Sequence, residues 1–214
     1  PGEHDLSHAK RVHREDFIDF MPTVWPLWEA SGRDGSTIPF TWPTRGLRGD
    51  RRPATIDALL GFYSFDAGAN FVAGTWEAIK SSYDVALTGA KLVQAGERAA
   101  FALCGPPGHH VASAFMGGYC YIINAALVAQ WFRDQGAARI SILDVDYHHG
   151  NGTQEIFYRR GDVQLLNLHA DPMVEYPYFL GHADEIGEGA GEGFNHNYPM
   201  PFGPMFDEGS ASLE

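Results

Sequence analysis

The stretch over 142–153 reads Ile-Leu-Asp-Val-Asp-Tyr-His-His-Gly-Asn-Gly-Thr, and it constrains the fold more than any other part of the chain. The apolar and β-branched residues that lead into it predict a strand over 139–146 whose end carries carboxylates and imidazoles. Similar strands alternate with helical patterns along the chain, which predicts an α/β fold with a mainly parallel sheet flanked by helices. Such sheets bind ligands at the carboxyl ends of their strands, so this stretch is the first candidate for a functional site.

Apolar periodicity and the positions of glycine and proline predict the remaining elements. They are a kinked helix over 17–28, an irregular loop over 36–53, a helix over 75–95, a short buried strand over 99–104, a helix over 124–135, a helical turn over 154–158, a loop over 181–193, and strands over 163–169 and 194–200. Thr75 is the expected N-cap of its helix, and Gly96 and Gly136 are expected to end the two longer helices.

Three polar residues at alternating positions, Asp144, Asp146 and His148, share one face for as long as the backbone stays extended. Carboxylates crowded at the end of an apolar strand repel each other and lose solvation, and a cation removes both problems. Carboxylate together with imidazole suits zinc, iron or manganese better than magnesium or calcium. The competing interpretation makes the aspartates caps of the next element and the histidines surface residues. We favour the metal site because the acids and imidazoles occur together.

Asp146 and His148 are the two good metal ligands in this stretch, and Asp144 is better placed behind them, as a partner of a ligand or a ligand of another ion. A catalytic zinc ion usually has three protein ligands and an open position, so a third ligand is required. Candidates by residue type alone are His169, Asp171, His182 and Asp184, and none has a convincing spacing.

A second pair of adjacent histidines, His109 and His110, follows a turn rich in proline and glycine over 105–108. Two imidazoles held on such a turn could reach a metal-bound water, one as a base and the other as an acid. The alternative is a pair of ordinary loop histidines. We favour a function because the same chain carries another, acid-rich histidine pair.

Two tyrosines, Tyr119 and Tyr176, lie in surroundings rich in glycine and proline. They could wall a narrow substrate channel, and they could equally be ordinary core or loop aromatics. The acidic cluster over 184–192 is interpreted as solvated surface.

Composition excludes several classes of function. A net charge of −12 repels phosphate backbones, so nucleic-acid binding is not expected. No apolar run approaches the ~20 residues of a membrane span, and the polar N-terminus is not typical of a signal peptide. Two cysteines without a Cys-x-x-Cys motif favour a reducing compartment, which predicts a cytoplasmic protein.

Three motifs together resemble the zinc-dependent histone deacetylase superfamily. They are Pro-Pro-Gly-His-His at 106–110, Gly-Gly-Tyr-Cys at 117–120, and Asp-Val-Asp-Tyr-His-His-Gly-Asn-Gly-Thr at 144–153. Gly-Thr-Trp-Glu-Ala at 74–78 and Tyr-Phe-Leu-Gly at 178–181 are most similar to the acetylpolyamine amidohydrolase branch. The resemblance implies an arginase/deacetylase-like fold that is incomplete at both ends, so that residues 1–214 form a single partial catalytic domain.

The resemblance also implies a reaction, the hydrolysis of an acetylated amine to acetate and the free amine. Asp146 and His148 would bind zinc, and His109 and His110 would be the general acid–base pair. The expected substrate is a small cationic acetylated amine or acetyl-lysine. The family's remaining aspartate ligand and its oxyanion-stabilising tyrosine belong to a C-terminal portion that is not present here.

Further positions take supporting roles by the same resemblance. Asp144 would hydrogen-bond to His109 and, together with Leu168, belong to the surroundings of a structural potassium ion. Asn151 would orient His110, and Tyr119 and Tyr176 would line the substrate tunnel. The loop over 36–53 is a candidate contact for a homodimer, because related amidohydrolases dimerise through an inserted loop.

Some positions depart from the family pattern. Asn167 stands in place of a serine that donates to potassium, and Gly68 stands where polyamine-specific members carry an acid. Two alternatives to the zinc amidohydrolase are a manganese ureohydrolase of the arginase type and a non-catalytic remnant that keeps the fold.

Overall fold

The computed structural model describes residues 1–44 and 49–201. The chain divides into two compact units, Pro1–Ala137 and Ala138–Glu214. Part of the predicted loop over 36–53, namely residues 45–48, lies outside the described residues. Within the described part, no helix combines the length and the apolar character that crossing a membrane requires.

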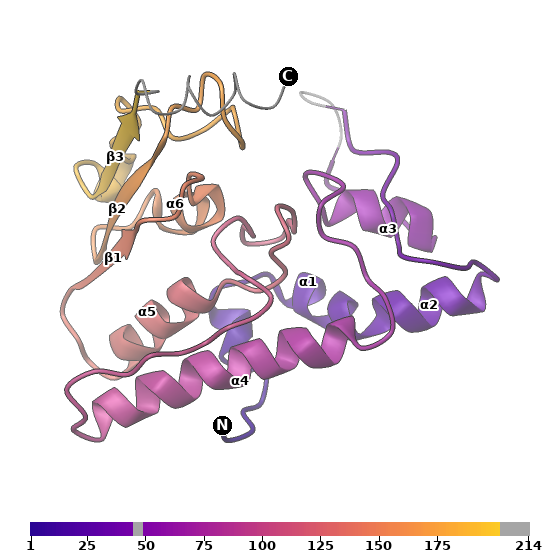
Figure 1. Ribbon diagram of the computed structural model, residues 1–214, viewed down its shortest axis with the longest axis horizontal. Helices are drawn as coiled ribbons and strands as arrows, with labels where there is room; N and C mark the ends of the chain where they lie inside the picture. The colour runs from indigo at the N-terminus through magenta and orange to yellow at the C-terminus, as the bar shows by residue number, and fades with distance from the viewer. Residues whose placement is uncertain (45–48, 202–214) are drawn as a thin grey trace, which may run out of the picture. The chain divides into compact units, whose positions relative to one another are not determined.

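The first unit is helical (Figure 1). Its elements are the 3-10 turn η1 (Ala9–Arg11), α1 (Glu15–Phe20), the 3-10 turn η2 (Met21–Thr23), α2 (Val24–Ala30), α3 (Ile56–Phe62), α4 (Thr75–Gln94) and α5 (Asn124–Asp134). The predicted break in the first helix is confirmed, because Pro22 lies in η2 between α1 and α2. The sequence analysis did not predict α3.

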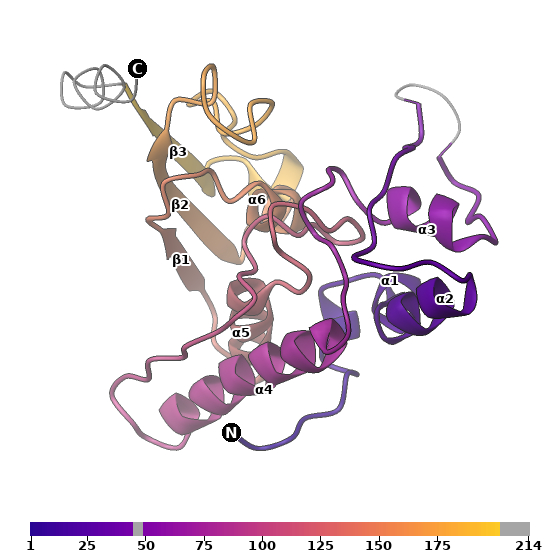
Figure 2. The ribbon, with the colours of Figure 1, turned by 45° about the vertical axis from the view of Figure 1, so that its right-hand side comes forward.

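The long helix α4 buries one face and runs beside α5 in both ribbon views (Figures 1 and 2). Ile79, Tyr83, Leu87 and Ala90 recur at helical spacing and are buried. The expected cap was wrong: Gly74, with φ 87°, is the N-cap, and Thr75 is the first helical residue. The hydroxyl of Thr75 instead accepts a hydrogen bond from the backbone N–H of Val72 at 2.9 Å.

The predicted buried strand over 99–104 is wrong. No strand forms there, and the side chains of Phe101 and Leu103 are 90% and 78% exposed. A strand needs a neighbour to satisfy its backbone groups, and none of the described strands pairs with this segment. The N–H of Cys104 instead bonds locally to the carbonyl of Ala102. The first histidine pair therefore follows an irregular segment and not a strand.

The second unit contains a parallel sheet in the order β1-β2-β3, with α6 against one of its faces (Figure 2). Its elements are β1 (Ile140–Asp144), α6 (Asn151–Phe157), β2 (Val163–Ala170), the 3-10 turn η3 (Gly189–Gly191) and β3 (Asn195–Met200). The register pairs Asp144 with Asn167 and Asn167 with Asn197. The predicted α/β class with a parallel sheet is confirmed, and polar residues lie in one row across its three strands.

Two boundaries differ from the prediction at the functional stretch. The first strand ends at Asp144 and not at 146, and α6 begins at Asn151 and not at 154. The strand ends early because carboxylates bond to the backbone ahead of them: Asp144 Oδ1 accepts the N–H of Asp146 at 3.1 Å, and Asp146 Oδ1 accepts the N–H of His148 at 2.9 Å. Two successive turns, each closed by an aspartate carboxylate that accepts the N–H two residues ahead, replace the extended backbone.

Candidate functional site

The adjacent histidines of the first unit form a close pair. The ring centroids of His109 and His110 are 4.0 Å apart, with their planes tilted by 42°. His110 is only 4% exposed, whereas His109 is half-buried. One imidazole is thus enclosed by the protein and the other reaches its surface, which suits a pair that passes protons to and from a substrate.

Gly108 allows the turn before the pair to lie against the start of α5. A Cβ added at this position would come within 2.6 Å of the carbonyl oxygen of Ile122 and 2.9 Å of the backbone nitrogen of Asn124. Both neighbours are backbone atoms, which cannot move aside as a side chain tip can. The glycine therefore fixes where the two histidines leave the turn.

Replacing Gly108 by alanine should lower the free energy of unfolding by about 2 kcal/mol, because the new methyl group overlaps the backbone. Urea unfolding measures this change. Gly105→Ala is the matched control, since a Cβ at Gly105 meets nothing within 4 Å. Equal stability of the two variants would contradict the role given to Gly108.

A buried histidine that the sequence analysis missed ties this region together. His13 donates from Nδ1 to the carbonyl of Ala112 at 3.0 Å, and its Nε2 accepts the N–H of Ile123 at 3.1 Å. These bonds require the neutral ring, and burial lowers the pKa of His13 to about 4. His13 thus joins the segment after the histidine pair to the residue before α5. Nothing in its local sequence marks this role.

The stability of the protein should fall as the pH drops from about 6.5 to about 4. In this range the unfolded chain protonates His13, whose ordinary pKa is 6.5, and the folded chain does not. The contribution is fully present above pH 6.5, and its loss reaches about 3 kcal/mol at the lower end. Thermal or urea unfolding across this range measures it. A His13→Asn variant, which keeps a donor for Ala112 but does not titrate, should show a shallower slope; an unchanged slope would rule out His13 as the cause.

Tyr119 lies on a tight turn of the first unit. Its side chain is 72% exposed and its backbone has φ 64°, in the left-handed region that non-glycine residues seldom adopt. Packing therefore does little to hold the side chain, and the direction of its Cα–Cβ bond is set by the backbone of the turn.

In the second unit, Asp146 and His148 approach each other at the end of β1. The distance from His148 Nδ1 to Asp146 Oδ1 is 3.7 Å, and both side chains are partly exposed. Two ligands about 2.0 Å from a tetrahedral zinc ion lie roughly 3.3 Å apart, so a small adjustment would let this pair share an ion. A carboxylate and an imidazole that converge in this way fit a zinc site.

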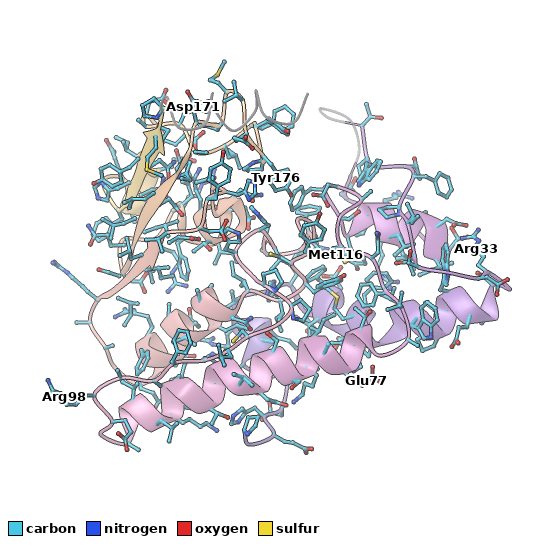
Figure 3. All side chains as sticks on the ribbon, viewed as in Figure 1. Arg33, Glu77, Arg98, Met116, Asp171 and Tyr176 are labelled. Carbon is cyan, nitrogen blue, oxygen red and sulfur yellow. The ribbon has the colours of Figure 1, made fainter. Side chains whose placement is uncertain are left out.

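Tyr176 belongs to the same cluster. Its ring meets that of His148 edge-on, with centroids 5.8 Å apart. Figure 3 shows Tyr176 and Asp171 in the segment that follows β2. The carbonyl of Tyr147 accepts the N–H of Ala170 at 2.8 Å, which ties the loop after β1 to the end of β2. The second unit thus brings Asp146, His148 and Tyr176 together.

The three positions with expected supporting roles, Asp144, Asn151 and Leu168, all belong to the second unit. Asp144 is the last residue of β1, and its carboxylate accepts the N–H of Asp146. Asn151 begins α6, and its N–H bonds to the carbonyl of His149 at 2.9 Å. Leu168 exposes 38% of its surface, between the buried neighbours Asn167 and His169, so a polar role would fall to its main-chain carbonyl.

A buried polar network lies behind the second histidine pair, and the sequence analysis did not predict it. Gln154 Oε1 accepts hydrogen bonds from His149 Nε2 at 3.0 Å, Asn195 Nδ2 at 3.0 Å and Asn197 Nδ2 at 2.8 Å. Gln154 Nε2 donates to Glu185 Oε2 at 2.6 Å. Burial, with a smaller effect of a neighbouring imidazole, lowers the pKa of His149 to about 3, so this ring is neutral. The network holds the residue next to His148 in place.

The four candidates for a third ligand do not join Asp146 and His148. His169 Nε2 donates to the carbonyl of Gly181 at 2.9 Å, and Asp171 Oδ1 accepts the N–H of Met173. Over residues 1–44 and 49–201, no group of three or more His, Cys, Asp or Glu side chains could hold a metal ion. Of the expected ligands, the described residues therefore bring Asp146 and His148 close to each other and no third group to them.

Comparison with known proteins identifies the family. The profile described as the histone deacetylase domain matches residues 1–211. The chain belongs to the histone deacetylase family. A solved structure of acetylpolyamine aminohydrolase from Burkholderia pseudomallei superposes with a TM-score of 0.87 at 36% identity, covering 100% of this chain and 63% of that one. The family fold predicted from the three motifs is thus confirmed.

Two curated relatives come from Pseudomonas aeruginosa. Acetylpolyamine amidohydrolase 2 is 53% identical over 214 residues, covering 100% of this chain and 62% of the relative. Acetylpolyamine amidohydrolase 1 is 56% identical over 205 residues, covering 95% of this chain and 59% of the relative. The chain thus spans about three fifths of the length of these two proteins.

Proposed function

We propose that the natural full-length protein is a zinc-dependent amidohydrolase that removes acetyl groups from acetylated amines. The observation that carries this proposal is the convergence of Asp146 and His148, 3.7 Å apart, in a chain that also has an adjacent histidine pair with rings 4.0 Å apart. The names of the relatives support an acetylpolyamine or acetyl-lysine type of substrate. Membership of the family favours this chemistry over that of a manganese ureohydrolase.

In this proposal, Asp146 and His148 hold the zinc ion, together with an aspartate from elsewhere in the full-length protein. Bound zinc supplies Lewis-acid activation of the acetyl carbonyl and of the attacking water. Asp144 and the main chain of Leu168 belong to a potassium site, and Asn151 orients His110.

The histidine pair moves the protons. One of His109 and His110 takes a proton from the water as its oxygen attacks the acetyl carbon. One of them then gives a proton to the amine nitrogen as the carbon–nitrogen bond breaks, so that acetate and the free amine leave. Tyr119 and Tyr176 wall the channel through which the acetylated chain enters.

The setting of the enzyme follows from the same proposal. We propose a cytoplasmic protein that dimerises through the loop over 36–53 and acts on a small cationic substrate. A net charge of −12 favours such a substrate and disfavours nucleic acid.

Metal analysis and turnover test the proposal together. The purified full-length protein should contain close to one zinc ion per chain and release acetate from acetylputrescine or from a fluorogenic acetyl-lysine. Asp146→Ala should lose the metal, whereas Asp162→Ala, which removes a carboxylate paired with Arg160, should keep it. Two manganese ions per chain would indicate the ureohydrolase, and zinc-loaded protein without turnover on either substrate would indicate a non-catalytic remnant.

A further inference from the structure

The turn that carries Tyr119 has an unusual backbone. Gly117 and Cys120 exchange two hydrogen bonds, of 3.3 Å and 2.8 Å, and the two residues between them have φ 53° (Gly118) and 64° (Tyr119). Two successive positive φ angles define the tight hairpin turn that normally takes Asn-Gly. A tyrosine at such a position costs about 1 kcal/mol or more, so surrounding contacts must hold it there.

The carboxylate of Asp66 provides such a contact. Its Oδ2 and Oδ1 accept the N–H of Gly118 at 3.0 Å and 3.3 Å, and Oδ1 also accepts the N–H of Gly68 at 2.8 Å. The hairpin's own hydrogen bonds do not use the N–H of Gly118. The carboxylate thus binds the N–H of Gly118, the residue directly before Tyr119, through a charge-assisted hydrogen bond.

Backbone hydrogen bonds also join the segment that leads into Asp66 to the segment that leads into the turn. The N–H of Phe65 bonds to the carbonyl of Met116 at 3.0 Å, and the N–H of Met116 bonds to the carbonyl of Tyr63 at 2.9 Å. Met116, labelled in Figure 3, is fully buried next to the turn. A Cβ on Gly117 would come within 2.4 Å of the Phe65 ring, so the two segments lie in close contact.

Gly68 leaves room for this arrangement. A Cβ at this position would lie 3.2 Å from Asp66 Oδ1 and 3.3 Å from the nitrogen of Gly118, tighter than ordinary contacts. Gly68, which departs from the polyamine-specific pattern, is therefore part of the structure that supports the turn.

We propose that Asp66 is a positioning residue that holds Tyr119 in its left-handed conformation and thereby sets the wall of the substrate channel. The catalytic part of this inference rests on the proposed function. Because Tyr119 is 72% exposed, packing does little to direct its side chain, and the backbone that Asp66 holds sets the direction in which its Cα–Cβ bond leaves the turn.

Steady-state kinetics of the full-length enzyme test the catalytic part. Asp66→Ala should raise KM at least fivefold and change kcat less than twofold, and Asp66→Asn should restore most of the loss because its amide oxygen still accepts the Gly118 N–H. Asp5→Ala is the matched control, since Asp5 also accepts a nearby backbone N–H, that of Ser7, and should leave KM within twofold.

A double-mutant cycle separates positioning from direct substrate contact. If Asp66 acts through Tyr119, then Asp66→Ala should raise KM less than twofold when Tyr119 is already glycine. Full additivity of the two changes would overturn the proposal, because Asp66 would then act independently of the tyrosine.

A spectroscopic readout keeps the inference testable if the enzyme proves inactive. In protein with 13C-labelled tyrosine, the Cα and Cβ shifts of Tyr119 report its backbone conformation, and Tyr119→Phe identifies the signal. Asp66→Ala should move these shifts away from left-handed values, and Asp66→Asn should not. Unchanged shifts in Asp66→Ala would overturn the positioning role whatever the activity of the enzyme.

Discussion

Replacing His110 by alanine in the full-length protein should lower kcat/KM by a factor of about 10²–10⁴, which is the usual range for the loss of a general acid–base group. His110 is 4% exposed, whereas the neighbouring His109, whose ring centroid lies 4.0 Å away, is half-buried, so the two imidazoles have different surroundings. Zinc content should not change, because His110 is not one of the proposed ligands. Turnover of acetylputrescine, together with metal analysis, measures both quantities.

The control for this variant removes a histidine from the same unit. His4→Ala takes away a ring that bonds to Thr88 on α4, and it should leave kcat/KM within about twofold. If His110→Ala turned over normally, His110 would have no part in the reaction. Loss of zinc in His110→Ala would instead point to a structural effect on the site.

Replacing Gln154 by leucine should lower the free energy of unfolding by about 4 kcal/mol, because several buried groups lose their partner at once. The side-chain oxygen of Gln154 accepts bonds from His149, Asn195 and Asn197, and leucine offers these donors nothing. Water cannot take its place, since Gln154 is only 3% exposed. The midpoint of urea unfolding measures the loss.

Gln164→Leu provides the matched control on the neighbouring strand. Gln164 accepts one bond from the exposed hydroxyl of Ser141, and its Nε2 lies 3.4 Å from Nε2 of the partly buried His196, so the loss of these two contacts should cost no more than about 1 kcal/mol. A similar small effect of Gln154→Leu would show that the network contributes little to stability. Weaker zinc binding in Gln154→Leu would in addition indicate that His149 steadies His148.

Prediction from sequence succeeded where the apolar periodicity of an element agreed with the glycine or proline residues at its ends. The helix that ends before Gly96 and the strand that begins at Val163 occur close to their predicted bounds. It failed over 99–104, where an apolar run without a partner strand stays irregular. It also failed at Asp144 and Asp146, because local bonds from carboxylate to backbone ended the strand earlier than β propensity indicates.

The sequence by itself determined the family, the parallel α/β class and the residue types of the candidate site. The family and the site residues can be recognised because they occur in short contiguous motifs such as 106–110 and 144–153. Only the tertiary structure decided which distant residues support them. His13 reaches Ala112 and Ile123, Gln154 reaches four partners, and Asp66 reaches the turn at Gly118. The physical reason is that a buried hydrogen bond needs two groups at about 3 Å, and folding, not spacing along the chain, brings such groups together.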